Sequence, residues 1–288
     1  MCRLLAYKGK DISINKLLYE PKNSLIKQSF DARELEEPLN GDGFGVGWYA
    51  HQLSSEPVVF VSVYPAWNNR NLRSLAPKVT TGSFIAHVRA ASVGNVSESN
   101  CHPFQYKNLL MAHNGGVEQF WKIKRKLRER LSDEFYNWIQ GETDSEHIFA
   151  LFLHHFMPKA QGEYTADDIK DALKQTLKDI EALMEECGIE EAAYLNLAVS
   201  DGVRIVALRY VTDPKVKPLT LYYSEGSKYE CIEGACHMIP AKPGEHSVLI
   251  VSEKLTDYAE DWRMVPDNYF ILVYKDLHVK LVAARDLA

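Results

Sequence analysis

The chain has 288 residues, with 33 basic and 39 acidic side chains and a formal charge of −6. This mildly acidic balance argues against non-specific nucleic-acid binding, and no apolar run approaches the roughly 20 residues of a membrane-spanning helix. The first residues carry charge too early for a secretory signal. The 5 cysteines are few and odd in number, which argues against a disulfide framework and for a reducing compartment. We therefore expect a cytoplasmic globular protein that binds neither nucleic acid nor membrane.

The first and last parts of the chain predict strands. Short segments rich in β-branched, aromatic or Leu residues alternate there with Gly, Pro, Asn and Ser. The expected strands cover residues 3–7, 45–50, 58–64, 84–90, 109–113, 195–199, 203–211, 219–223 and 247–251, and a further hairpin surrounds Lys275 and Asp276. Asp201 and Gly202, between two of these strands, form a strong hairpin signal.

The middle of the chain predicts three helices. Residues 117–139 have apolar side chains three or four positions apart. Residues 145–156 are apolar almost all round, which predicts a buried helix, and Thr165 is the expected N-cap of a helix that runs to about residue 187. Strands, helices and strands again, without a linker or repeat, predict an α/β (α+β) fold in a single domain of residues 2–288, with packed sheets and helices outside.

Cys2 is the most informative residue. A methionine before a small residue is normally removed, and Cys2 then carries both its thiol and a free α-amine. The ordinary pKa of that amine, about 7.7–8.0, leaves part of it neutral at pH 7, so the thiol has a built-in base and needs no histidine partner. Position alone favours the simpler alternative, a small residue that opens the first strand.

Three other segments place polar side chains where a strand ends or a helix begins. Arg89, in the segment 87–92, has a planar fork suited to a carboxylate. Asn114 and Gly115 offer an amide and flexible N–H groups suited to an oxyanion, and Asp144 suits either a substrate ammonium or a helix cap. Each also has an ordinary alternative: Arg89 as a solvated arginine at a strand end, Asn114 and Gly115 as a turn, and Asp144 as part of a helix cap.

The order of these segments gives them weight. In this order, four segments resemble the glutaminase domain of class II glutamine amidotransferases: an N-terminal Cys, HVRAAS at 87–92, HNGG at 113–116 and TDSE at 143–146. The start MCRLLAY, NGDGFGVGWY at 40–49 and NCHPF at 100–104 look like its compact, stand-alone branch of YafJ-type proteins and ergothioneine-pathway γ-glutamyl hydrolases. The resemblance implies a four-layer αββα N-terminal-nucleophile (Ntn) sandwich, with the motifs in about residues 2–157.

The resemblance also implies roles for six residues: the nucleophile and oxyanion groups Cys2, Asn114 and Gly115, and the substrate-binding groups Arg89, Ser92 and Asp144. The amine of the nucleophile would act as the base. The arginine and serine would hold the α-carboxylate of a γ-glutamyl substrate and the aspartate its α-ammonium, which would reject asparagine and internal peptide glutamines. Ala90 and Val93 stand where some relatives have Trp and His, which leaves the shape of the pocket open.

Several other patterns have simpler interpretations. The glycines of 41–47 lack the spacing of a dinucleotide-binding loop and suit close packing. Cys231, Cys236 and His237 lack the second half of a zinc site, and Cys101 beside His102 is interpreted as a structural neighbour of the site and not as a catalytic dyad. The helix histidines His147, His154 and His155 are expected to be ordinary core or surface residues. The basic run 122–130 is expected to be a solvated helix face, with a surface for a partner protein as the alternative. No metal or cofactor is expected.

We therefore predict hydrolysis of the γ-amide of glutamine through a γ-glutamyl thioester on Cys2. One alternative is a stand-alone hydrolase of a specialised γ-glutamyl compound, peptide or glutathione-like, and another is a noncatalytic glutamine-sensing subunit. No synthetase domain is recognisable in the 288 residues, so ammonia transfer would require a synthetase or peptidase partner protein.

Overall fold

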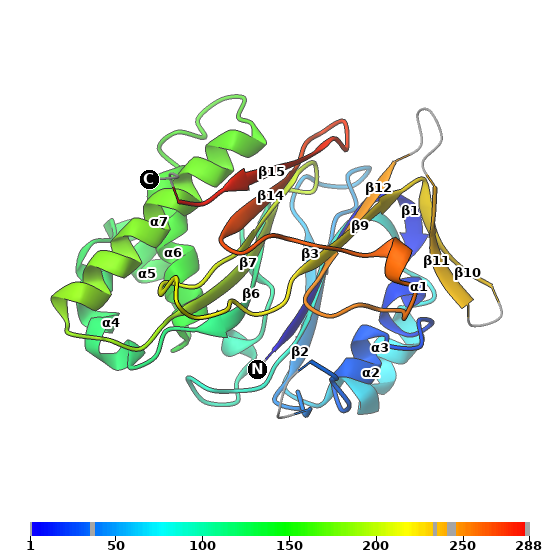
Figure 1. Cartoon of the computed structure of the whole chain (residues 1–288), viewed down its shortest axis with the longest axis horizontal. Coiled ribbons are helices and arrows are strands. Elements are labelled where there is room, and N and C mark those ends of the chain that lie inside the picture. Colours follow the sequence, from blue (N-terminus) through cyan, green and yellow to red (C-terminus); the bar gives the residue numbers. More distant parts are fainter. Residues whose placement is uncertain (1, 35–37, 233–234, 241–245, 286–288) are drawn as a thin grey trace.

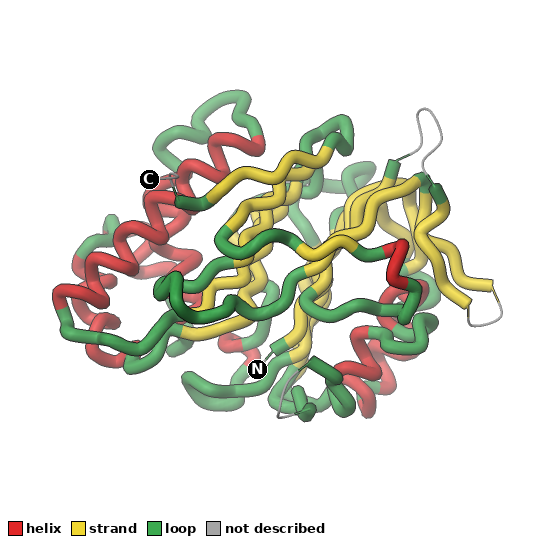
Figure 2. The backbone as a smooth tube through the Cα atoms, viewed as in Figure 1, coloured by secondary structure: helices red, strands yellow, loops and turns green. Residues whose placement is uncertain are grey.

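The computed structural model describes residues 2–34, 38–232, 235–240 and 246–285. Two antiparallel sheets lie face to face in the middle of the molecule, and helices cover the outer face of each (Figures 1 and 2). These four layers confirm the αββα sandwich.

The larger sheet carries the start of the chain at its centre. Its strand order is β13-β9-β12-β1-β4-β2-β3. These strands are β1 (Arg3–Ser13), β2 (Phe44–Trp48), β3 (Val58–Ser62), β4 (Thr80–Val88), β9 (Tyr222–Gly226), β12 (Ser247–Val251) and β13 (Arg263–Met264). Because β1 and β4 are antiparallel, with Arg3 opposite Val88, the start of one and the end of the other meet at the same edge.

The smaller sheet has the order β15-β14-β8-β7-β6-β5. Its strands are β5 (Phe104–Tyr106), β6 (Leu109–Gly116), β7 (Tyr194–Ser200), β8 (Ile205–Arg209), β14 (Tyr269–Val273) and β15 (Val279–Ala283). The remaining strands, β10 (Lys228–Ile232) and β11 (Ala235–Ile239), form a separate hairpin.

Two groups of helices form the outer layers (Figure 1). The smaller sheet is covered by α4 (Phe120–Glu129), α5 (Asp133–Trp138), α6 (Asp144–Phe156) and α7 (Ala166–Glu186), and the larger sheet by α1 (Asn15–Leu18), α2 (Leu25–Gln28) and α3 (Arg70–Leu75). Short 3₁₀ turns are η1 (Ala66–Asn68), η2 (Glu98–Asn100) and η3 (Ala259–Asp261).

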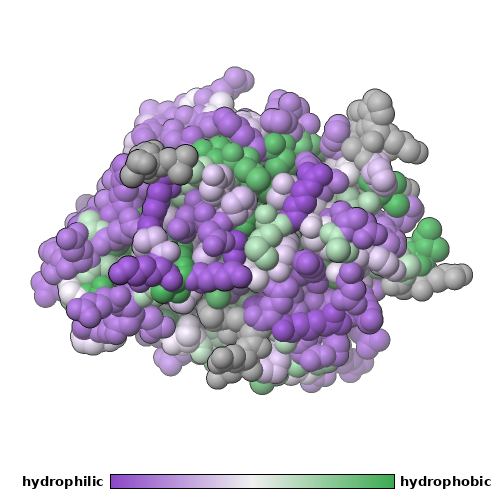
Figure 3. Space-filling view, viewed as in Figure 1, coloured by the Kyte–Doolittle hydropathy of each residue, from purple (hydrophilic) through white to green (hydrophobic). Residues whose placement is uncertain are grey.

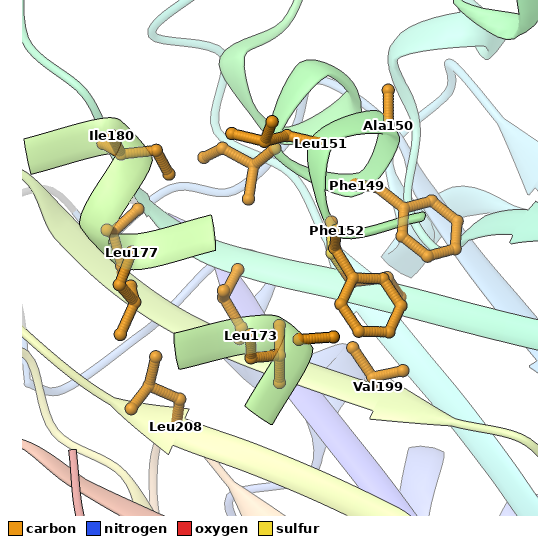
Figure 4. Close-up of a cluster of buried hydrophobic side chains, with 14 of the residues drawn as sticks. Phe149, Ala150, Leu151, Phe152, Leu173, Leu177, Ile180, Val199 and Leu208 are labelled. Atoms are coloured by element: carbon orange, nitrogen blue, oxygen red, sulfur yellow. The ribbon is translucent and has the colours of Figure 1, made fainter. Parts of the chain in front are cut away.

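Alternation along β1 shows how one strand serves two cores. Leu4 and Ala6 face the interior between the sheets, whereas Leu5 and Tyr7 face the helices, and all four are buried. A strand that is buried on both faces reads as a continuous apolar run. On the other side of the sandwich, aromatic and aliphatic side chains of α6 and α7 pack over β7 and β8 (Figure 4).

The structure corrects the single helix expected over 117–139. The chain forms α4 and α5, separated at residues 130–132, because Ser132 adopts an extended conformation (φ −67°, ψ 160°) and starts a new helix. The apolar spacing continues across the break, so it could not reveal it. The short helices α1–α3 and the hairpin of β10 and β11 were not predicted either.

The hairpin of β10 and β11 also contains a disulfide between Cys231 and Cys236, a pair that was not predicted from the sequence. The two residues lie directly opposite each other in the antiparallel register. Both sulfurs are thereby unavailable to a metal, and Cys2, Cys101 and Cys187 are free thiols. The reducing compartment stays a prediction.

The surface drawn in Figure 3 is mainly hydrophilic, with hydrophobic residues in small scattered groups. Among the described residues, no helix combines the length and the apolar composition that a membrane crossing requires.

Candidate active site

Cys2 lies immediately before β1, beside the residues that follow β4. Its Sγ is 3.4 Å from the backbone nitrogen of Ala90 and 3.5 Å from the carbonyl oxygen of the same residue. These are the only hydrogen-bond partners of Sγ in the described part of the chain. Burial raises the pKa of the Cys2 thiol, and the N–H of Ala90 and the charge of Arg89 oppose this effect. The thiol is therefore protonated near pH 7 and needs a base to become a nucleophile.

Arg89 follows β4 and is 2 % exposed. Its guanidinium donates hydrogen bonds to the carbonyl oxygens of Val93 (2.9 Å), Gly94 (3.4 Å) and Asn95 (3.2 Å), so it holds the following loop in place. It forms no ion pair with a described carboxylate. A buried guanidinium bound only to neutral carbonyls keeps its full charge for a ligand.

Asp144 begins α6 and is 4 % exposed. Its Oδ2 accepts the N–H of Val117 at 2.8 Å, and its Oδ1 accepts the N–H of Ser145 at 2.8 Å. The helix cap is supplied instead by Thr143, whose side chain accepts the N–H of Glu146. Asp144 therefore has a position of its own beside the cap, and no described cation pairs with it.

Both charges act on the same thiol. The charge of Arg89 lowers the pKa of the Cys2 thiol and the charge of Asp144 raises it. Buried charges are normally paired, because the free energy of burying an unpaired charge is unfavourable by about several kcal/mol. A guanidinium and a carboxylate that each lack an ion-pair partner in the described chain suit a ligand with both a carboxylate and an ammonium.

Asn114 and Gly115 end β6. Asn114 is 2 % exposed, and its Oδ1 has no hydrogen-bond partner in the described part of the chain. Gly115 has a φ of 148°, and a Cβ there would overlap the carbonyl oxygen of Tyr194, so only glycine fits. Val117, two residues after Gly115, donates its N–H to Asp144 at the start of α6.

Ser92 is exposed on the loop that Arg89 holds, beside a cavity of about 590 Å³. The cavity is also lined by Gly116, the last residue of β6, by Val117, which follows it, and by Trp121 and Lys124 of α4. Ser92 is thus on the same side of the site as Asp144, whose Oδ2 would be 3.6 Å from a Cβ at Gly116.

Three buried histidines lie behind the site. His87 packs against His102 with 4.1 Å between ring centroids, and the Nε2 of His87 is 3.1 Å from the carbonyl oxygen of His113. Burial lowers the pKa of each, to about 3 for His87. These rings are neutral at pH 7 and none has a described hydrogen bond to Cys2.

The competing patterns have ordinary structural explanations. The Sγ of Cys101 lies 3.5 Å from the carbonyl oxygen of Ser97, and His102 has no hydrogen bond to it, so these neighbours form no dyad. His147 contacts Thr143 and Arg128, and His155 contacts Asp179. The basic run 122–130 lies in α4 and at its C-cap, Arg130, and its cations pair with acidic side chains at Glu129, Asp179 and Glu186. The glycines of β2 pack closely, as expected: a Cβ at Gly45 would overlap the carbonyl oxygen of His102.

The sequence did not point to Arg3 or Glu253. They form a buried ion pair beside Cys2 with 2.9 Å between Nε and Oε2. They are 250 positions apart in the chain, and neither belongs to a local motif. Only the pairing of β1 with β12 brings them together.

A family model described as class II glutamine amidotransferases matches residues 1–224. The chain belongs to this family. The match covers all six of the expected site residues and ends before β12. This class II amidotransferase is therefore an amidohydrolase enzyme.

Two curated relatives agree with this assignment. The amidotransferase is 40 % identical over 293 residues to the "probable glutamine amidotransferase DUG3" of Saccharomyces cerevisiae, a match that covers 96 % of this chain and 82 % of the yeast protein. It is 34 % identical over 121 residues to the "gamma-glutamyl-hercynylcysteine sulfoxide hydrolase" of Mycobacterium tuberculosis, covering 41 % of this chain and 51 % of that protein.

A solved structure supports the fold. A glutamine aminotransferase class-II domain protein from Silicibacter pomeroyi superposes with a TM-score of 0.67 at 24 % identity, over 98 % of each chain. At this identity the likeness concerns the arrangement of the sheets and helices.

Proposed function

We propose that this enzyme hydrolyses the γ-amide of glutamine, or of a related γ-glutamyl compound, through a γ-glutamyl thioester on Cys2. The observation that carries the proposal is a pair of buried charged side chains, Arg89 and Asp144, that have no ion-pair partner among the described residues and that both affect the pKa of the free thiol. Arg89, with Ser92, would take the α-carboxylate of the substrate, and Asp144 would take its α-ammonium. The γ-carbonyl carbon of a molecule held in this way would face Sγ.

The base in this proposal is the α-amine that Cys2 carries once the first methionine has been removed. The thiol is protonated at neutral pH, and its hydrogen-bond partners within the described chain are backbone groups of Ala90. With no side-chain base at Sγ, an amine on the same residue is the simplest acceptor for the thiol proton.

The steps balance without a cofactor. Sγ attacks the γ-carbonyl carbon while its proton passes to the α-amine, and the oxyanion that forms is stabilised by Asn114 and Gly115. The C–N bond then breaks as the same proton passes to the leaving nitrogen. Water attacks the thioester, and glutamate leaves with regeneration of the thiol.

A second candidate differs only in the leaving group. The similarity to a mycobacterial γ-glutamyl hydrolase favours a larger γ-glutamyl compound as the substrate. We propose that residues 2–288 act as one domain and that ammonia, if it is transferred rather than released, passes to a partner protein.

The test is the intact mass of the protein before and after treatment with a diazo-ketone analogue of glutamine. This probe requires the nucleophile and the two charged clamps but no particular leaving group. We expect a chain without its first methionine that gains one adduct on Cys2, and no adduct on the C2A variant.

A processed chain that remains unlabelled would refute the thioester mechanism and favour a noncatalytic glutamine-binding subunit. Release of ammonia from glutamine, compared with release of glutamate from γ-glutamyl peptides, then separates the two candidate substrates. An active C2A variant would refute the role of this thiol.

A further inference from the structure

Arg3 binds the residue that precedes it. Its Nη1 donates to the carbonyl oxygen of Cys2 at 2.9 Å, and its Nε donates to Oε2 of Glu253 at 2.9 Å. Arg3 is 2 % exposed and Glu253 1 %, so their ion pair lies away from solvent, whereas the bond to Cys2 is partly buried. Arg3 thereby links the backbone of Cys2 to Glu253, which lies two residues after the end of β12.

Glu253 is in turn fixed by several segments. Its Oε1 accepts the side-chain amide of Asn23 and the backbone N–H of Arg33, each at 2.9 Å. The loop before α2, the loop after it and the end of β12 therefore meet at one carboxylate. An arginine that pairs with this carboxylate has little freedom to rotate.

This arrangement matters for an N-terminal nucleophile. Such a residue has no preceding peptide bond, so its backbone is attached to the protein only through its own carbonyl group. Rotation about the Cα–C bond moves the amine relative to the rest of the site, and a hydrogen bond to the carbonyl oxygen limits that rotation.

We propose that Arg3 is a positioning residue, which fixes the peptide plane of Cys2 so that the amine and the thiol share one productive orientation, and that Glu253 holds Arg3 in place. The proposal rests on the proposed function, because it assigns the α-amine the role of base.

Two observations distinguish this role from simple stabilisation. The Nη1 of Arg3 donates to the carbonyl oxygen of Cys2 and its Nη2 is buried without a hydrogen-bond partner in the described part of the chain, so Arg3 holds Glu253 by the Nε alone and not by a two-donor fork. A buried ion pair also adds little net stability compared with apolar side chains of the same size. Stability alone therefore does not explain why Arg3 also donates a hydrogen bond to the carbonyl oxygen of Cys2.

The test measures inactivation by the diazo-ketone analogue of glutamine, which separates the affinity for the probe, KI, from the rate of attack, kinact. In R3K the charge remains, but one ammonium does not reproduce two donors in a rigid fork. We expect kinact to fall by about tenfold or more, because a misplaced base loses part of the roughly 10²- to 10⁴-fold rate enhancement that general base catalysis provides. KI should be unchanged. E253Q should behave alike.

R33K is the matched control. Arg33 lies on the same framework, but its side chain forms a half-exposed ion pair with Asp257, and only its backbone N–H binds Glu253. We expect wild-type kinact and KI. Intact mass must show the first methionine removed in every variant.

The outcomes are separable from failure of the proposed function. If wild-type protein is not labelled, the function itself is wrong. If wild type is labelled and R3K and E253Q keep its kinact, the positioning role is wrong. A fall in kinact accompanied by a raised KI or by loss of the cooperative thermal transition would make the pair a folding element and would also overturn the proposal.

Discussion

Asp144 is buried in a place that water hardly reaches. Backbone N–H groups of Val117 and Ser145 satisfy one acceptor site on each of its oxygens, which leaves further lone pairs for a ligand. The cost of burying this carboxylate is thus partly offset before any substrate binds.

The first prediction concerns the D144N variant. The amide keeps the size of the side chain but loses the charge that we assign to binding the ammonium. A hydrogen bond to a charged group contributes roughly 1.5–3 kcal/mol, so KI of the diazo-ketone analogue should rise by about 10- to 100-fold. D133N, on the exposed start of α5, should leave KI unchanged; an unchanged KI in D144N would remove the aspartate from the clamp.

The second prediction concerns Gly115. Its φ of 148° and the nearby carbonyl of Tyr194 exclude a side chain. G115A should lower the free energy of unfolding by roughly 3 kcal/mol or more, because strain and overlap combine. G162A is the control, since nothing lies within 4 Å of a Cβ there, and denaturant unfolding should show a change within about 1 kcal/mol. Equal stability of the two variants would contradict the geometry at Gly115.

At the scale of elements, the helices of the outer layer differ in how they begin. α7 starts with a complete capping box: Thr165 accepts the N–H of Asp168, and the carboxylate of Asp168 accepts the N–H of Thr165. α5 starts at Ser132, whose side chain makes no such bond. The same class of N-cap residue therefore contributes differently in the two helices.

The third prediction uses this difference. T165A should lower the free energy of unfolding by about 1 kcal/mol, the usual contribution of an N-cap bond, whereas S132A should change it by less than about 0.5 kcal/mol. Both are measured by urea unfolding, with labelling of Cys2 as a check that the site is intact. Similar losses in the two variants would show that the capping box adds nothing.

How far the sequence predicts the fold depends on whether the signal is local. Thr165 was identified as a cap, and the buried helix α6 was predicted from its composition, because both patterns lie within a few residues. The break at Ser132 was missed because apolar spacing continues through it. The candidate site is predicted from the order of short motifs and the family resemblance they carry, because each motif alone has an ordinary alternative. The ion pair of Arg3 with Glu253 depends on a register between distant strands, which no local pattern encodes.

On the scale of the whole molecule, buried histidines link stability to pH. Burial is the largest cause that lowers the pKa of His87 to about 3 and that of His147 to about 4. The charge of Arg128 further opposes protonation of His147, and that of Arg89 does so at His87. In the unfolded chain both have a pKa of about 6.5.

The fourth prediction follows from the sign of these shifts. Between about pH 6.5 and pH 4 the unfolded state binds more protons than the folded state, so stability is full above this window and falls as the pH falls. Each histidine should lower the free energy of unfolding by about 2 kcal/mol between pH 6.5 and pH 5. Urea unfolding at several pH values checks this, and H147Q should show a shallower dependence; an identical slope would contradict it.

The pairing of β1 with the end of β12 has a consequence for the time at which the site forms. The chain between Arg3 and Glu253 spans 250 positions, and a ribosome adding about 5–20 residues per second needs roughly 12–50 s to produce it. Throughout that interval the beginning of the nascent chain lacks the carboxylate that later encloses it. Under the proposed mechanism, this delay gives an aminopeptidase time to remove the first methionine before the sheet closes beside Cys2, so late closure of the sheet would allow the nucleophile to mature.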